Sequence, residues 1–167
     1  MKKLRSEITR SVRQQKHFAI LFLNIDRFKE VNEMYGPLTG DRILRQIADR
    51  LSGICSSDDF AARLAGDVFG LLLPDVADYD EAIEIVHRTR RIIADPVAEG
   101  DAFLKLTASV GVCLYPDDGD TEEMLVRNAE SALHVAKVGG RNIYHFFDQK
   151  VHEDLLRRIH LEKEIER

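Results

Sequence analysis

Residues 60–73 of the chain, FAARLAGDVFGLLL, consist of two apolar runs separated by the short turn Ala65-Gly66-Asp67. Gly66 can adopt the positive φ that a tight connection between two strands needs. The runs 60–64 and 68–73 therefore predict a β-hairpin with Asp67 at its tip. An acidic residue after glycine is common in such turns for geometric reasons, so Asp67 alone indicates a functional site only weakly.

Apolar patterns on both sides of the hairpin predict the other elements. Residues 18–25 (FAILFLNI) form a nearly continuous apolar run, which is typical of a strand covered on both faces. Residues 104–114 alternate in polarity and predict one long strand. Helices are predicted over residues 5–16, 39–54, 78–95, 121–138 and 149–167, and a last strand over 143–147. This order predicts an α+β fold, with a central mixed or antiparallel sheet flanked by helices.

Composition limits the classes of function. The chain has 167 residues and a net charge of −5, so we expect one globular unit without the basic surface that a nucleic acid requires. A mononucleotide remains possible, because a few local cations suffice for it. No apolar run is long enough to span a membrane, and we expect no membrane contact by this chain. Cys55 and Cys113 match neither a metal motif nor a disulfide framework, which favours a reduced, cytoplasmic compartment, although a longer parent protein could be membrane-anchored.

Several polar residues flank the apolar elements, and each has a structural as well as a functional explanation. Residues 24–29 (NIDRFK) follow the first strand, where a carboxylate is well placed for a metal or phosphate or simply enters solvent. Asn32 and Asp41 could cap helices. Lys137 and Arg141 could be favourable cations at a helix C-terminus. Taken singly, these residues leave both explanations open.

Their order along the chain resembles that of the GGDEF domain, the domain of diguanylate cyclases. Residues 63–69 (RLAGDVF) resemble the signature R-x-G-G-D/E-E-F, and residues 24–32 (NIDRFKEVN) resemble D-x-D-x-F-K-x-I-N. Gly40-Asp41 resembles the G-D that follows. Downstream, residues 109–112 (SVGV) resemble the S-I-G strand, and residues 129–142 (AESALHVAKVGGRN) resemble A-D-x-A-L-Y-x-A-K-x-x-G-R-N. The resemblance covers roughly residues 5–147 and implies a palm-like, nucleotidyl-cyclase-like sheet.

The resemblance also implies a binding site for GTP over the hairpin. In the family, two such domains face each other, and the 3′-hydroxyl of each GTP attacks the α-phosphate of the other to give cyclic di-GMP. The resemblance implies that Mg²⁺, with Mn²⁺ as the alternative, is held weakly on the phosphates. The implied nucleotide-binding residues are Lys29, Asn32, Asp41, Gly66, Lys137 and Arg141, and the implied metal ligands are Asp67, Asn24 and the backbone carbonyl of Ile25.

Three positions depart from the family pattern in ways that affect catalysis. Asn24 replaces a metal-binding Asp, and an amide oxygen binds Mg²⁺ more weakly than a carboxylate does. Ala65 replaces the first signature Gly and places a methyl group where phosphates approach. Val68 replaces the signature Glu and can neither bind metal nor accept a proton. Because loss of a catalytic base alone costs about 10² to 10⁴ in rate, we expect little or no cyclase activity.

The family's inhibitory product site, R-x-x-D, corresponds to residues 56–59 (SSDD), which lack the Arg. We therefore expect no inhibitory site of high affinity. Residues 1–148 are assigned to the GGDEF-like domain, and residues 149–167 resemble the connector helix that leads toward an EAL phosphodiesterase domain. The expected partners are GTP and a linked EAL domain, and assembly with a second copy of the chain is left open. Three hypotheses follow, in order of preference: a GTP-binding regulatory module, a weakly active cyclase, and an interaction scaffold that binds no nucleotide.

Overall fold

The structure is a computed structural model that describes residues 2–56 and 58–165. Its main sheet has five strands in the order β2-β3-β1-β6-β7. Adjacent strands are antiparallel, except that β6 and β7 are parallel. The strands of this sheet are β1 (Phe18–Ile25), β2 (Phe60–Ala65), β3 (Val68–Pro74), β6 (Ala108–Tyr115) and β7 (Tyr144–Phe146). The sheet is therefore mixed, as the sequence predicts.

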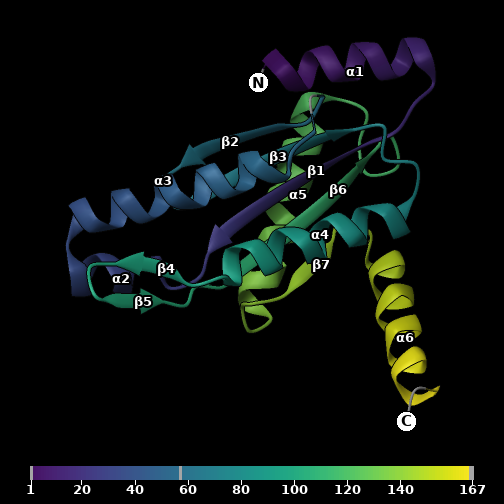
Figure 1. Cartoon of the computed structure of the whole chain (residues 1–167). Helices are drawn as coiled ribbons and strands as arrows, with labels where there is room; N and C mark the ends of the chain where they lie inside the picture. The colour runs from purple at the N-terminus through teal and green to yellow at the C-terminus, as the bar shows by residue number, and fades with distance from the viewer. Residues whose placement is uncertain (1, 57, 166–167) are drawn as a thin grey trace.

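Helices cover both faces of the sheet, and a small hairpin lies beside it (Figure 1). In the view of Figure 1, α3 and α4 cross the near side of the sheet, α5 lies behind it, and α6 projects away from the domain. The helices are α1 (Lys2–Gln14), α2 (Phe28–Tyr35), α3 (Pro37–Ile54), α4 (Tyr79–Ala94), α5 (Glu122–Val138) and α6 (Gln149–Ile165), and the hairpin strands are β4 (Val97–Glu99) and β5 (Ala102–Leu104). The predicted α+β class is confirmed. Among the described residues, no helix combines the length and the hydropathy that crossing a membrane would require.

The strand β1 is buried along its whole length and separates two apolar cores. Leu21 and Leu23 face the core formed with α3 and α4, whereas Ile20 and Phe22 face the core formed with α1 and α5. Each fully buried aliphatic side chain contributes about 1.5–3 kcal/mol relative to exposure, so this strand is the centre of the fold. The prediction of a doubly covered strand is confirmed.

The structure differs from the sequence analysis at two places, where one predicted strand is wrong and one helix was not predicted. The alternating segment 104–114 is not one strand, because the chain leaves β5 at Leu104 and enters β6 only at Ala108. β5 pairs with β4 instead of extending the main sheet. Residues 28–35 form the separate helix α2, which the sequence analysis did not predict. Gly36, with φ of 89°, divides α2 from α3.

The helix α6 is attached to the domain through its first turns. Leu155 is buried, and the ring of His152 stacks on that of His145 at a centroid distance of 4.0 Å. The backbone N–H of Phe146 donates to His152 Nδ1 at 3.3 Å. Burial, together with the neighbouring His145, lowers the pKa of His152 to about 4. His152 is therefore neutral near pH 7 and can accept this hydrogen bond.

Close packing of α5 on β6 generates a stability prediction. A Cβ atom added to Gly111 would lie 2.3 Å from the backbone nitrogen of Leu133 and 2.7 Å from the carbonyl oxygen of Ala129, and backbone cannot move aside cheaply. Gly111→Ala should therefore destabilise the domain by about 1–3 kcal/mol in urea unfolding. The matched control is Gly53→Ala in α3, where a Cβ meets nothing within 4 Å, and which should be neutral or stabilising. Equal stability of the two variants would show that α5 does not lie directly on β6.

Candidate functional site

The turn of the β2–β3 hairpin is held against the end of β1. The carbonyl oxygen of Asp67 accepts the backbone N–H of Ile25 at 3.1 Å and the side-chain Nδ2 of Asn24 at 3.4 Å. Asn24 is buried and lies opposite Val68 in the β1–β3 register. The three residues predicted to bind a metal are therefore neighbours, although they include only one carboxylate.

A pocket of about 250 Å³ lies between the hairpin turn, α2 and the start of α3. It brings together five of the predicted residues, which come from three separate segments: Lys29, Asn32, Asp41, Gly66 and Asp67. We call it the α2–hairpin pocket. The first turn of α3 makes the arrangement possible, because a Cβ on Gly40 would lie 1.8 Å from Asn32 Oδ1. Glycine at position 40 therefore allows Asn32 to lie against α3.

Arg63 is a residue of this pocket that the sequence analysis did not single out. Its Nε donates to the carbonyl oxygen of Gly66 at 2.6 Å, and its Nη2 lies 3.9 Å from Asp41 Oδ1. The ion pair is exposed and contributes little to stability. Its geometric effect is larger, because Arg63 fixes the turn and faces Asp41. The signal that could have found it is its place as the first residue of the signature 63–69.

Lys137 lies in a different pocket, of about 270 Å³, together with the two altered signature positions Ala65 and Val68. Much of the remaining lining is apolar and includes Phe22 and Leu133. The side of the hairpin that carries position 68 thus presents aliphatic groups where a catalytic carboxylate would be needed.

Arg141 lies in a third pocket, of about 380 Å³, between α2, residues 104–107 and residues 140–142. Lys137 and Arg141 therefore line different pockets, and neither lines the α2–hairpin pocket. Their joint role in phosphate binding stays a prediction.

The carboxylate of Asp26 does not have the role that its position at the strand end suggested. It is buried and accepts three hydrogen bonds: from Ser109 Oγ at 2.6 Å, Thr107 Oγ1 at 2.7 Å and the backbone N–H of Asn142 at 2.8 Å. Its own N–H donates to the carbonyl oxygen of Thr107 at 2.9 Å. Asp26 thus joins β1, the start of β6 and the loop after α5.

The region of the family's inhibitory motif forms a small pocket of about 150 Å³ that includes Asp59, Ser56 and Arg88. Asp59 Oδ2 accepts the backbone N–H of Ser56 at 2.9 Å, so this carboxylate stabilises the local turn. Arg88 comes from α4 and not from the R-x-x-D position. The absence of a high-affinity product site stays a prediction.

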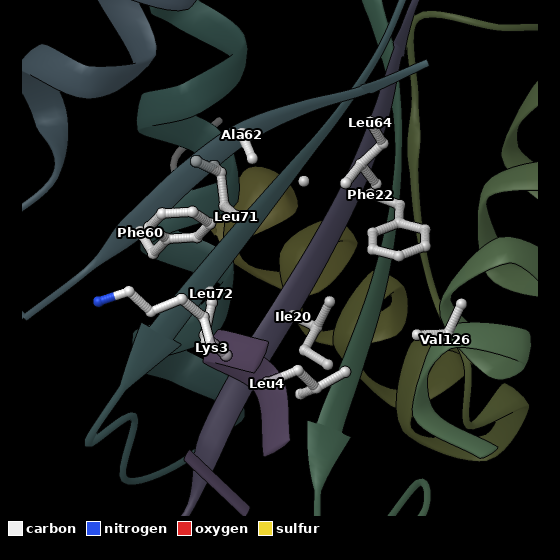
Figure 2. A pocket seen from close by; sticks show the side chains of 11 residues that line it. Lys3, Leu4, Ile20, Phe22, Phe60, Ala62, Leu64, Leu71, Leu72 and Val126 are labelled. Atoms are coloured by element: carbon white, nitrogen blue, oxygen red, sulfur yellow. The ribbon is translucent and has the colours of Figure 1, made fainter. Parts of the chain in front are cut away.

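Another pocket differs from these in having a mostly apolar lining. It has a volume of about 220 Å³ and lies on the α1 side of the sheet, between β2, β3 and β1 (Figure 2). Its lining is apolar except for Lys3, whose Nζ lies 5.6 Å from the ring centroid of Phe60. With one titratable residue and no predicted site residue, it offers no groups for phosphoryl chemistry.

The fold and the arrangement of motifs around the hairpin define a palm-like α+β domain, and comparison with known proteins identifies its family. The family model described as "Diguanylate cyclase, GGDEF domain" matches residues 1–143. The chain belongs to the GGDEF family.

Its relatives include multidomain signalling proteins. MucR of Pseudomonas aeruginosa, named a bifunctional diguanylate cyclase/cyclic di-GMP phosphodiesterase, is 33% identical over 95% of this chain and 23% of its own length. NbdA of the same species, named a cyclic di-GMP phosphodiesterase, is 36% identical over 90% of this chain and 19% of its own length. The chain therefore spans about a fifth of the length of these relatives. The crystal structure of the GGDEF domain of TpbB (YfiN) from P. aeruginosa is similar with a TM-score of 0.84 and 30% identity, covering 87% of this chain and 91% of that chain.

The role of Asp26 can be tested by unfolding. Asp26→Ala leaves the buried donor of Ser109 and the partly buried donors of Thr107 and Asn142 without their acceptor, which should lower the free energy of unfolding by about 3 kcal/mol. Asp49→Ala, at an exposed position on α3, is the control and should change stability by less than about 0.5 kcal/mol. If the two variants unfold at the same urea concentration, the joining role of Asp26 is wrong.

Proposed function

We propose that this chain is a degenerate GGDEF domain of cyclic di-GMP signalling that binds GTP and regulates a linked phosphodiesterase domain, with little or no cyclase activity of its own. The observation that supports it most is the α2–hairpin pocket, where residues from α2, α3 and the hairpin turn converge. These residues are distant in sequence, and the fold brings them into one pocket.

The pocket is suited to guanine. The Asp41 carboxylate can only accept hydrogen bonds, and guanine offers adjacent N–H donors on its Watson–Crick edge. Adenine presents an acceptor at the corresponding ring nitrogen. The Asn32 amide can both donate and accept, so it can pair with the remaining polar atoms of the base. Lys29 lies in the same pocket and can meet a phosphate.

The metal-binding groups suit an ion that arrives with the nucleotide. Mg²⁺ usually takes one or two protein carboxylates and completes its shell with phosphate oxygens and water. Asp67 supplies one carboxylate, and Asn24 and Ile25 lie beside it. Within residues 2–56 and 58–165, no group of three or more His, Cys, Asp or Glu residues could hold a metal ion. The ion would supply charge neutralisation on the phosphates, and we expect its binding to depend on GTP.

The residues around the hairpin turn lack the groups that cyclisation needs. The side chain of Val68 has no oxygen, and Ala65 lies beside it in the pocket that also contains Lys137. Asn24 directs its Nδ2 toward the Asp67 carbonyl oxygen. Binding can survive these changes because it depends on the base and the phosphates. Catalysis depends on activating the 3′-hydroxyl, for which neither metal nor base is well supplied.

A regulatory role through a linked EAL domain is supported by the relatives and by the end of the chain. Two relatives have names that include cyclic di-GMP phosphodiesterase activity. The helix α6 leaves the domain beyond Leu155 and has exposed apolar residues, including Leu156 and Leu161. We propose that α6 is the connector and that GTP binding changes the activity of the next domain through it. Assembly of two copies is compatible with this role but is not required by it.

Nucleotide selectivity tests the binding site. Isothermal titration calorimetry should show that GTP binds more tightly than ATP by on the order of 1–3 kcal/mol, because adenine leaves the Asp41 carboxylate facing an acceptor. Mg²⁺ should strengthen GTP binding. The control variant Asp41→Asn, whose amide can donate, should bind GTP and ATP with similar affinity. Equal affinity of the wild-type chain for both nucleotides would show that Asp41 does not read the base.

Restoration of the signature tests the loss of catalysis. The wild-type chain should make no appreciable cyclic di-GMP, and single reversions should gain little, because metal position and hydroxyl activation act together. The triple variant Asn24→Asp, Ala65→Gly, Val68→Glu, fused to a dimeric coiled coil, should form product that chromatography detects. The matching control is the unmodified chain in the same fusion. Robust product from that control would overturn the proposal that the domain is inactive.

A further inference from the structure

The apolar pocket on the α1 side of the sheet has no part in the proposed function, and we call it the α1–β2 cleft. Its volume is about 220 Å³, and its lining comes from α1, α5 and the strands β1, β2 and β3. Figure 2 shows Phe60, Leu64, Phe22 and Ile20 arranged around a common space, with Lys3 at its edge. The cleft therefore combines a continuous apolar lining with a single charged side chain.

The cleft arises from the sequence of the two strands that form its floor. In the register of the sheet, Gly70 of β3 lies between Ala62 of β2 and Phe22 of β1. Two adjacent positions thus carry no side chain larger than a methyl group, whereas the next positions on the same face of β2 are Phe60 and Leu64. A Cβ added to Gly70 would lie 3.1 Å from Leu64 Cδ1, so Leu64 lies close over the glycine. Large side chains on both sides of a small pair leave a depression.

The walls of the cleft are apolar groups that face solvent. Phe60 is 39% exposed and Leu64 is 42% exposed. Covering such side chains with an apolar ligand removes their surface from water, which is favourable. An apolar cavity of about 150 Å³ holds the six carbons of benzene, so the α1–β2 cleft has room for a chain of about eight carbons.

The charge at the edge of the cleft favours an anionic head group. The Nζ of Lys3 lies 5.6 Å from the ring centroid of Phe60. Within the part of the chain that the structure describes, Lys3 forms no ion pair. Lys3 belongs to the first turn of α1, which contains no acidic residue, and the positive end of the helix dipole favours a carboxylate there. A ligand with one apolar chain and one carboxylate matches both the lining and the charge.

We propose that the α1–β2 cleft binds the anion of a medium-chain fatty acid of about eight carbons, with its chain over the small residues of β2 and β3 and its carboxylate at Lys3. This site goes beyond the proposed function and does not depend on it. Phe22 and Leu64 line both this cleft and the pocket that holds Lys137. The bound chain therefore touches the strand that leads into the turn of the hairpin.

NMR titration of the chain with octanoate and with 1-octanol tests the recognition of the carboxylate. Octanoate should give saturable shifts of the amide signals of Ala62 and Gly70. Lys3→Gln should weaken octanoate binding about two- to fivefold and leave 1-octanol binding unchanged, because only octanoate carries a charge. Lys150→Gln, which removes an exposed cation of α6, is the matched control and should change neither affinity.

Filling the depression tests the place of the apolar chain. Ala62→Leu puts a larger side chain between Phe60 and Leu64 and should abolish saturable binding of both ligands, while the midpoint of thermal unfolding stays the same or rises. Ala98→Leu, the same substitution at an exposed position of β4, is the matched control and should bind both ligands as the wild-type chain does. If Ala62→Leu does not fold, the comparison of octanoate with 1-octanol in Lys3→Gln decides.

The contrary outcomes are distinct. Octanoate that does not bind the wild-type chain saturably would overturn the proposal, and so would undiminished binding by folded Ala62→Leu. Octanoate affinity that is unchanged in Lys3→Gln would contradict the recognition of the carboxylate. Analytical ultracentrifugation covers the other occupant, a second copy of the chain. A dimer that Ala62→Leu dissociates, without octanoate binding, would show that the cleft is a protein interface and would contradict a fatty-acid site.

Discussion

The arrangement of the site depends on the hydrogen bonds made by one buried carboxylate, that of Asp26. β1 is the strand on which both cores are built, and its end must be fixed if the residues that follow are to be placed accurately. Asp26 fixes it by accepting donors from Thr107, Ser109 and Asn142. A buried carboxylate is tolerated only when it is hydrogen-bonded, so a carboxylate at position 26 requires all three donors to be in place. These hydrogen bonds also position the loop after α5 and the start of β6.

A second tie connects the end of β1 to the hairpin turn. The carbonyl oxygen of Asp67 accepts hydrogen bonds from Ile25 N–H and Asn24 Nδ2. The hydrogen bonds of Asp26 and of the Asp67 carbonyl oxygen fix the end of β1, from which α2 starts. The two sides of α2 line different pockets, one with Asn32 and one with Arg27. The geometry suitable for a nucleotide is thus a property of the fold and can outlast the loss of catalytic groups such as the one at Val68.

The sequence predicts the parts of this structure that local patterns determine. The β2–β3 hairpin follows from its turn and its apolar runs, and β1 follows from its continuous apolar character. The break at residues 105–107 was not predicted, because the alternation of polar and apolar residues continues through residues 104–114 and gives no sign of it. The helix α2 was missed because it has only eight residues, which is shorter than the window over which a helical period is recognised.

For the site, the resemblance to the GGDEF family led to Asn32 and Asp41, which the structure places in one pocket. The central claim is that the domain holds GTP without converting it. The most direct test is a ¹H–¹⁵N and ³¹P NMR titration of the chain with GTP and Mg²⁺. If the domain holds GTP without converting it, the amide signals of Lys29, Asn32 and Gly66 will shift and the triphosphate signals will persist throughout. Unchanged amide signals at saturating GTP, or the appearance of the phosphodiester signal of cyclic di-GMP, would contradict it.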